Sequence, residues 1–140
     1  MLDMQANLNQ IDQVVLALKE YTQTLPCIFL LQGDLASGKT TLIQHYCKVL
    51  NAPLATSPTF TLLHVYQSPT LCIYHYDFYL KEVEELFTLG ILENLEQKGV
   101  HFIEWGGEAL HSLLRSFGLD LFILSLKRTQ HTCHYKLRHG

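Results

Sequence analysis

An eight-residue stretch at residues 33–40 constrains the fold of this chain more than any other feature. It reads Gly-Asp-Leu-Ala-Ser-Gly-Lys-Thr and matches the P-loop pattern G-x-x-x-x-G-K-[ST]. In such a loop the glycines let the backbone curl, so that successive N–H groups point at one phosphate. A helix that follows adds the positive end of its dipole. The motif therefore predicts a phosphate-binding loop between a strand and a helix.

The residues on either side of the loop agree with this prediction. Residues 27–31 form a short apolar run, which is typical of a buried parallel strand, and residues 41–50 carry apolar side chains at helical spacing. In this setting Lys39 would reach the β and γ phosphates of a nucleotide, and the Thr40 hydroxyl would bind Mg²⁺. The predicted nucleotide-binding residues of the loop are Gly33, Asp34, Leu35, Ala36, Ser37, Gly38, Lys39, Thr40 and Thr41.

The rest of the chain alternates between helical and extended patterns. Helices are predicted over 7–24, 82–88, 91–98 and 108–116, and strands over 60–66, 71–76, 100–103, 119–126 and 132–137. This alternation favours an α/β fold, with a central parallel sheet extended by antiparallel strands and helices on both faces. A length of 140 residues, of which 48% are hydrophobic, predicts a single P-loop NTPase domain over residues 1–140.

Charge and cysteine content exclude several other classes of protein. The formal net charge is -3 and the basic residues are thinly spread, so neither DNA nor a broad nucleic-acid surface is expected. The sequence has neither a signal-peptide pattern at its start nor an apolar run of the ~18 residues that a membrane span requires. The four cysteines are far apart, which is typical of reduced thiols. We therefore expect a cytoplasmic protein without a membrane partner.

Two acidic residues follow apolar runs and are candidates for the chemistry. Asp77 follows residues 71–76, and Glu104 follows residues 100–103. In parallel α/β sheets, ligands gather beyond the carboxyl ends of the strands. A P-loop enzyme needs a carboxylate there to position Mg²⁺ and water, so both acids are predicted metal ligands and catalytic residues. The sequence does not decide which acid is nearer the metal. His75 is more typical of a packed histidine than of a general base.

Absent motifs narrow the class of P-loop protein. The sequence has neither the N-K-x-D signature of a guanine site nor the D-x-x-G switch, so it is not a typical GTPase. Residues 1–114 contain no arginine. A small-molecule kinase uses cations to hold phosphates and screen charge in the transition state. An ordinary nucleotide kinase is therefore disfavoured, although a small P-loop kinase stays an alternative.

Four segments together resemble the TsaE family, the small bacterial ATPases of the tRNA threonylcarbamoyladenosine (t6A) pathway. They are GDLASGKTT (33–41), SPTFTLLHVY (57–66), YHYDFY (74–79) and IEWG (103–106), and the similarity extends over about residues 7–126. The resemblance implies a weak, partner-stimulated Mg²⁺-dependent ATPase that acts with TsaB and TsaD. TsaD would attach the threonylcarbamoyl group to tRNA, so contact with tRNA is expected to be only indirect. A non-hydrolysing ATP-gated assembly factor is the other alternative.

The resemblance also implies roles for individual residues. Thr59 would belong to a switch-like loop that faces the γ-phosphate and would take part in catalysis, and Trp105 would belong to the nucleotide site. The chain departs from the family at Ala36, where the usual GDLGAGKT loop has glycine. Alanine is unfavourable if this position needs a positive φ angle. A second departure is Leu80, where an arginine often follows the aspartate motif.

Overall fold

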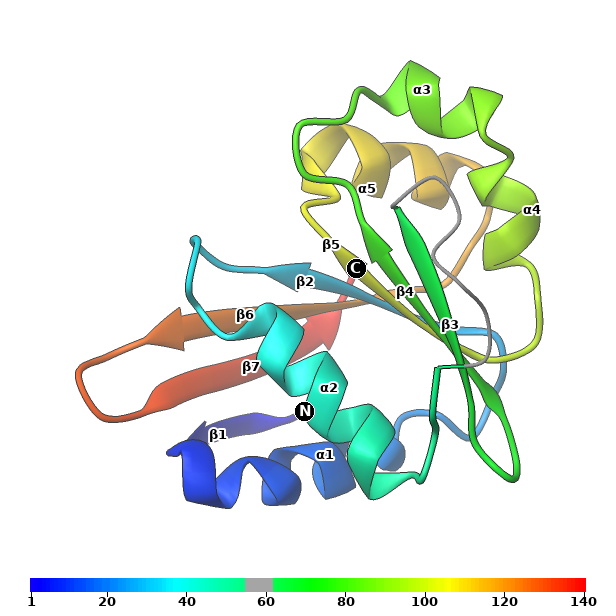
Figure 1. The fold of residues 1–140 in the computed structure, drawn as a ribbon. Helices are drawn as coiled ribbons and strands as arrows, with labels where there is room; N and C mark the ends of the chain where they lie inside the picture. The colour runs from blue at the N-terminus through cyan, green and yellow to red at the C-terminus, as the bar shows by residue number, and fades with distance from the viewer. Residues whose placement is uncertain (55–61) are drawn as a thin grey trace.

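A seven-stranded mixed sheet organises the computed structural model, which describes residues 1–54 and 62–140 (Figure 1). The strand order is β1-β7-β6-β2-β5-β4-β3. The strands are β1 (Asp3–Ala6), β2 (Cys27–Gln32), β3 (Leu63–Gln67), β4 (Cys72–Asp77), β5 (Val100–Glu104), β6 (Phe122–Arg128) and β7 (Cys133–His139). Strands β6, β2, β5 and β4 run parallel, whereas β3, β7 and β1 are antiparallel additions at the two edges. The predicted α/β fold with a central parallel sheet is confirmed.

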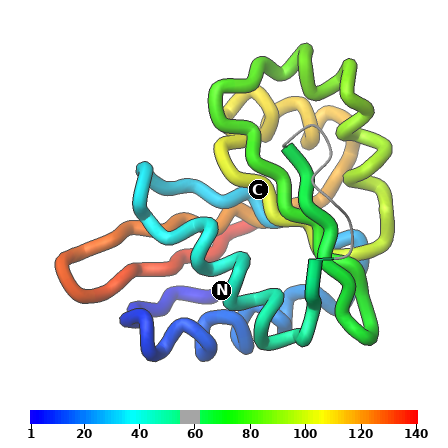
Figure 2. Tube along the Cα trace, in the orientation of Figure 1, coloured from blue at the N-terminus to red at the C-terminus, as the bar shows by residue number. Residues whose placement is uncertain are grey.

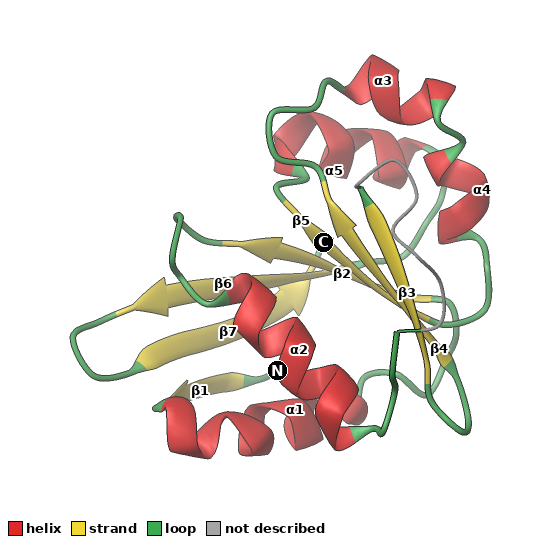
Figure 3. Ribbon diagram, viewed as in Figure 1, coloured by secondary structure: helices red, strands yellow, loops and turns green. Residues whose placement is uncertain are grey.

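Helices cover both faces of the sheet (Figure 3). They are α1 (Ile11–Lys19), which follows a short 3-10 turn at Leu8–Gln10, α2 (Lys39–Val49), α3 (Val83–Thr88), α4 (Ile91–Leu95) and α5 (Gly107–Ser116). Helices α1 and α2 pack in one core cluster, and α3, α4 and α5 pack in the other. No helix within residues 1–54 and 62–140 combines the length and the apolar character that crossing a membrane requires.

Strand β2 has apolar residues at every core position because it contributes to both clusters. Phe29 and Leu31 face the α1 and α2 side, and Ile28 and Leu30 face the α5 side. All four side chains are almost fully buried. A strand covered on both faces reads as a continuous apolar run rather than as an alternating one. The predicted buried parallel strand before the loop is therefore confirmed.

The register of the parallel strands sets the position of the site. Leu31 of β2 pairs with Glu104 of β5, and Glu104 pairs in turn with Asp77 of β4. The carboxyl ends of three adjacent strands therefore lie side by side, and the P-loop leaves β2 at this edge. The tube in Figure 2 shows the loop after β2 and the end of β4 on the same side of the molecule.

The predicted secondary structure was wrong in several places. The helix predicted over 91–98 ends at Leu95, and the strand predicted over 119–126 begins at Phe122. Strand β1 was not predicted, and it forms by pairing with β7, as in the register of Asp3 with Lys136. The helix predicted over 7–24 is shorter, because α1 ends at Lys19. The amides of Tyr21 and Thr22 bond to carbonyls three residues earlier, at 3.0 and 3.2 Å, and this tightened turn ends the helix.

Candidate functional site

The backbone of the P-loop depends on glycine at two positions for two different reasons. Gly38 has a φ angle of 101°, which side-chain-bearing residues rarely adopt. At Gly33 a Cβ atom would lie 2.6 Å from Ser37 Oγ and 2.8 Å from the carbonyl oxygen of Leu126, so crowding excludes a side chain. Ala36 has a φ angle of 61°. The position does require the left-handed conformation, and alanine adopts it at a cost in strain.

The Lys39 ammonium is held at the mouth of the loop. Its Nζ atom donates to the carbonyl oxygens of Gly33 at 2.7 Å and Asp34 at 3.0 Å, and to Ser37 Oγ at 3.3 Å. All three acceptors belong to the loop itself. An anion in the loop offers the ammonium stronger acceptors than these neutral oxygens.

Aromatic side chains cover the other side of this lysine. Lys39 Nζ lies 4.0 Å from the centroid of the Trp105 ring, a cation–π geometry, and Tyr79 packs against Trp105 with ring centroids 5.1 Å apart. Lys39 is only 4% exposed. Burial lowers the pKa of Lys39, and nearby carboxylates, Glu104 first among them, oppose the shift. The carboxylates around Lys39 therefore offset part of the effect that burial has on its pKa.

Glu104 connects β5 to the first turn of α2. The Thr40 hydroxyl lies 3.0 Å from each oxygen of the Glu104 carboxylate and donates to it. Glu104 is 3% exposed, and its Oε2 atom also lies 2.5 Å from Nε2 of His75. The hydroxyl and the carboxylate predicted as metal ligands are therefore in contact, although 64 residues separate them in the sequence.

Asp77 takes a different position from Glu104. Its Oδ1 atom accepts a hydrogen bond from the amide of Tyr79 at 3.1 Å, which stabilises the turn after β4. Asp77 is partly exposed and has no hydrogen bond to Thr40 among the described residues. Of the two predicted acids, Glu104 is therefore the one that contacts the P-loop helix.

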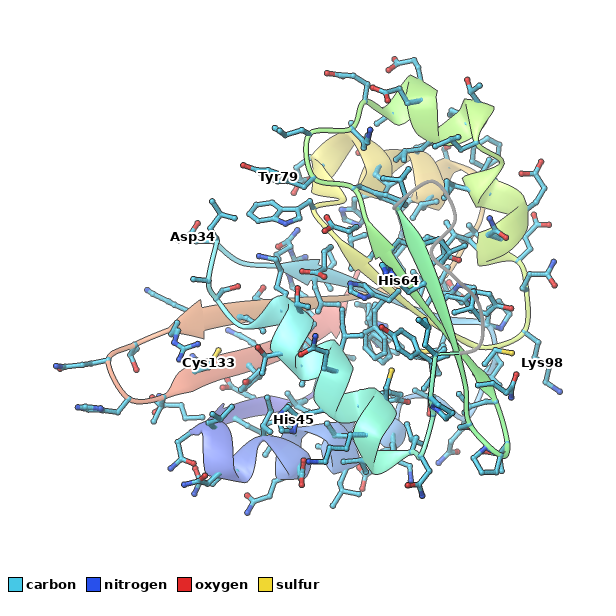
Figure 4. The ribbon with its side chains drawn as sticks, viewed as in Figure 1. Asp34, His45, His64, Tyr79, Lys98 and Cys133 are labelled. Atoms are coloured by element: carbon cyan, nitrogen blue, oxygen red, sulfur yellow. The ribbon has the colours of Figure 1, made fainter. Side chains whose placement is uncertain are left out.

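A pocket of about 310 Å³ opens between the loop and the strand ends. Its lining includes residues 35–41 of the loop together with Asp77, Glu104 and Trp105, all of which were predicted. It also includes Tyr79, which sequence reasoning did not assign. Figure 4 shows Asp34 and Tyr79 near one another at one side of the molecule, with Lys98 on the opposite side. Gly33 and Asp34 contribute through their carbonyl oxygens, which hold Lys39.

A second pocket, of about 100 Å³, lies on the other side of the loop. It is lined by Ser37, Gly38 and Thr41 and by residues from both ends of the chain, among them Asn7 and Arg128. No local pattern in the sequence indicated this pocket, because β1 and β7 bring its walls together only in the folded chain. Thr59, the remaining predicted site residue, falls in residues 55–61, outside the described part of the chain.

Within the described residues, no three His, Cys, Asp or Glu side chains gather in a way that would hold a metal ion by themselves. The oxygen donors that line the pocket include the Thr40 hydroxyl and the carboxylates of Glu104 and Asp77. Mg²⁺ prefers oxygen ligands and is usually bound by one or two carboxylates together with substrate phosphates and water. The donor set fits that kind of shared coordination, and it does not fit a site made by the protein alone.

In comparisons with known proteins, one family matches most of the chain. The model of the family described as "Threonylcarbamoyl adenosine biosynthesis protein TsaE" matches residues 5–133. A "tRNA threonylcarbamoyladenosine biosynthesis protein TsaE" of Rickettsia typhi is 38% identical over 115 residues, which cover 78% of this chain and 76% of that protein. A protein of the same name from a Nostoc species is 37% identical over 117 residues, which cover 72% of each chain.

A solved structure shares the fold. The crystal structure of YdiB from Bacillus subtilis superposes with a TM-score of 0.63 and covers 99% of this chain and 86% of that one. The two sequences are 20% identical in this alignment. The overall fold of this chain is therefore shared with an experimentally determined protein.

Proposed function

Because the chain belongs to the TsaE family of threonylcarbamoyl adenosine biosynthesis proteins, we propose that it is a Mg²⁺-dependent ATPase acting with TsaB and TsaD. The family takes part in tRNA threonylcarbamoyladenosine biosynthesis. The observation that carries the ATPase proposal is the contact between Thr40 and Glu104 beside the buried Lys39. One pocket therefore holds the Lys39 cation, which would bind phosphate, together with the Thr40 hydroxyl and the Glu104 carboxylate.

The loop would bind the phosphates of ATP. Lys39 would exchange its bonds to the carbonyls of Gly33 and Asp34 for bonds to phosphate oxygens, which are stronger acceptors. The amides at the start of α2 point toward the same place and favour an anion. Lysine and amides fixed in this way would stabilise the charge that develops as the γ-phosphoryl group is transferred.

Thr40 and Glu104 would hold Mg²⁺ together with the phosphates of the nucleotide. When bound, the ion would neutralise phosphate charge. Glu104, or Asp77 on the neighbouring strand, would orient the water that attacks the γ-phosphate in line with the leaving oxygen. Within the described residues, these are the two carboxylates that line the pocket.

The geometry also suggests where the base would bind. The carboxylates stand on one side of the loop, so the γ-phosphate belongs on that side. The chain of phosphates would then lead the nucleoside to the other side, toward the 100 Å³ pocket beyond Gly38. We place the adenosine there, near Arg128 and Asn7. This assignment predicts no contact between the base and Trp105.

TsaB and TsaD are proposed as partners, with tRNA bound only indirectly through them and with the cytoplasm as the place of action. Hydrolysis would sustain the modification cycle of the partner complex. Two other functions make different predictions. A small kinase would move the γ-phosphate to an acceptor. An assembly factor would bind its partners only with ATP and would release no phosphate.

Trp105 provides the first experiment, because it is the only tryptophan of the chain and lies beside Lys39. Addition of ATP with Mg²⁺ should change its fluorescence, and phosphate release should be slow alone and faster with TsaB and TsaD of the same organism. Labelled phosphate on an acceptor would instead indicate the kinase. Binding of ATP without phosphate release, alone and with partners, would refute the ATPase.

A further inference from the structure

His75 occupies a buried position behind the pocket, and its ring is directed at the acid of the site. It lies on β4 and is 7% exposed. Its Nε2 atom is 2.5 Å from Oε2 of Glu104, a short contact between a ring nitrogen and a carboxylate oxygen. His75 is not part of the pocket lining, so it does not face a bound substrate.

The sheet register explains why these two side chains meet. His75 pairs with Phe102 of β5, and Asp77 pairs with Glu104. Paired residues and residues two apart share one face of a sheet, so all four lie on the α2 face. His75 is then the diagonal neighbour of Glu104, within reach of a ring. Glu104 has a like charge, Asp77, directly opposite it, and a donor, His75, on the diagonal.

We propose that His75 is a positioning residue for Glu104. The Nε2–H group donates to Oε2 and holds the carboxylate in one orientation, with Thr40 bonded to the same group from α2. Metal-binding carboxylates are commonly fixed by such a partner. The inference rests on the proposed function, because it assigns His75 to the Mg²⁺-binding step of that ATPase.

A second buried histidine shows what simple packing looks like in this fold. Nε2 of His101 donates to the carbonyl oxygen of Gln97, and Nδ1 accepts from the Tyr76 hydroxyl, both at 2.8 Å. Both partners of that ring are structural, and neither lines the 310 Å³ pocket. The partner of His75, in contrast, is the Glu104 carboxylate of the site. Positioning is therefore a third interpretation of His75, beside the packing and general-base interpretations considered from the sequence.

A second histidine ring lies beside His75 on the neighbouring strand. His64 of the edge strand β3 pairs with His75 across the antiparallel ladder, and the ring centroids are 5.8 Å apart with the planes tilted by 30°. Figure 4 labels His64 on this strand. His64 is more exposed than His75, and in the described part of the chain it makes no hydrogen bond to Glu104. It therefore offers a matched control, a ring at the same level of the sheet without the carboxylate contact.

The test compares the Mg²⁺ dependence of ATP binding in three variants, followed by Trp105 fluorescence. His75→Phe keeps the ring and removes the donor, His75→Gln keeps a donor at a similar reach, and His64→Phe is the control. We expect His75→Phe to raise the Mg²⁺ concentration at half-effect by about 10- to 100-fold. His75→Gln should restore most of this loss, and His64→Phe should resemble the wild type. ATP affinity in excess chelator should change less than about twofold in all three.

A wild-type Mg²⁺ dependence in folded His75→Phe would overturn the inference. Thermal unfolding of each variant establishes that it is folded. If His75→Phe does not fold, His75→Asn replaces it, since asparagine is one methylene shorter than glutamine. Equal Mg²⁺ dependence in His75→Asn and His75→Gln would then overturn the inference. An absence of any Mg²⁺ effect in the wild type would instead refute the proposed function, so the two failures are distinguishable.

Discussion

The ammonium group of Lys39 lies 4.0 Å from the centroid of the Trp105 ring. Trp105 directly follows Glu104 and has a φ angle of 63°, which is rare for a bulky residue. The end of β5 thus delivers a carboxylate to Thr40 and an indole to Lys39 from two consecutive residues. Strained backbone of this kind is concentrated at functional sites. A nucleotide that binds Lys39 must therefore alter the surroundings of the indole.

Replacing Lys39 by alanine should weaken ATP binding by about 10- to 100-fold, because hydrogen bonds to a charged group contribute roughly 1.5–3 kcal/mol. Lys48→Ala is the matched control, since it removes a lysine from the exposed far end of the same helix. Titration calorimetry with ATP measures both variants. Unchanged affinity and unchanged hydrolysis in Lys39→Ala would show that the phosphates bind elsewhere.

Glu104→Gln should reduce phosphate release more than Asp77→Asn does. The amide of glutamine can still accept from Thr40, but it lacks the charge that a metal ion requires, and a loss of about 10²–10³-fold is typical for one such group. Asparagine at 77 can keep the bond from the Tyr79 amide, so the turn after β4 should persist. Steady-state measurements of phosphate release show which of the two variants loses more activity. A larger loss in Asp77→Asn would indicate that Asp77, rather than Glu104, is the acid nearer the metal ion.

Ala36→Gly and Gly38→Ala should shift stability in opposite directions. The first relieves about 1–2 kcal/mol of left-handed strain and loses about 0.5–1 kcal/mol to the freer unfolded chain, so the melting temperature should rise by about 1–3 °C. The second places a residue with a side chain at a backbone φ angle of 101° and should lower the melting temperature. Differential scanning calorimetry of both variants without nucleotide measures the direction of each shift in melting temperature. A lower melting temperature for Ala36→Gly would mean that alanine is unstrained here.

His101 should make stability depend on pH in the acidic range. Burial lowers the pKa of this histidine from 6.5 to about 4, although its bond to the Gln97 carbonyl opposes the shift. The unfolded chain therefore binds a proton between these values that the folded chain does not, and stability falls as the pH falls from about 6.5 to about 4. The loss is at most about 3 kcal/mol.

Urea unfolding at several pH values tests this expectation through the slope of free energy against pH. In His101→Asn the slope should flatten, whatever the absolute stability of the variant. Burial also lowers the pKa of His64, which contributes with the same sign and is retained in that variant. An unchanged slope in His101→Asn would assign the acid sensitivity to other groups.

Much of the fold could be predicted because local signals were strong. The apolar run of β2, the P-loop and the periodicity of α2 each occupy consecutive residues. The strands predicted over 60–66 and 71–76 correspond to β3 and β4, which pair antiparallel. Strand β1 could not be found in the same way. Asp3–Ala6 has no marked pattern of its own, and it becomes a strand only because β7 offers an open edge more than 100 residues later.

The site was predictable in its residue types and not in its contacts. Glu104 and Asp77 were recognised as strand-end acids, but only the register of β4, β5 and α2 shows that Glu104 meets Thr40. The partner of His75 and the role of Tyr79 depend on the same register, which no local pattern encodes. For Ala36 the sequence left open whether the position needs a positive φ angle, and the structure shows that it does, with a φ angle of 61°.

The strict alternation of β5 has a consequence for how this chain can change over generations. Glu104 reaches the α2 face because it lies an even number of residues from Phe102, which packs there against Tyr46. One residue inserted between the two would send the carboxylate into the apolar layer under α5, and no substitution elsewhere could bring it back. Almost no length variation among descendants of this chain should therefore survive within β5.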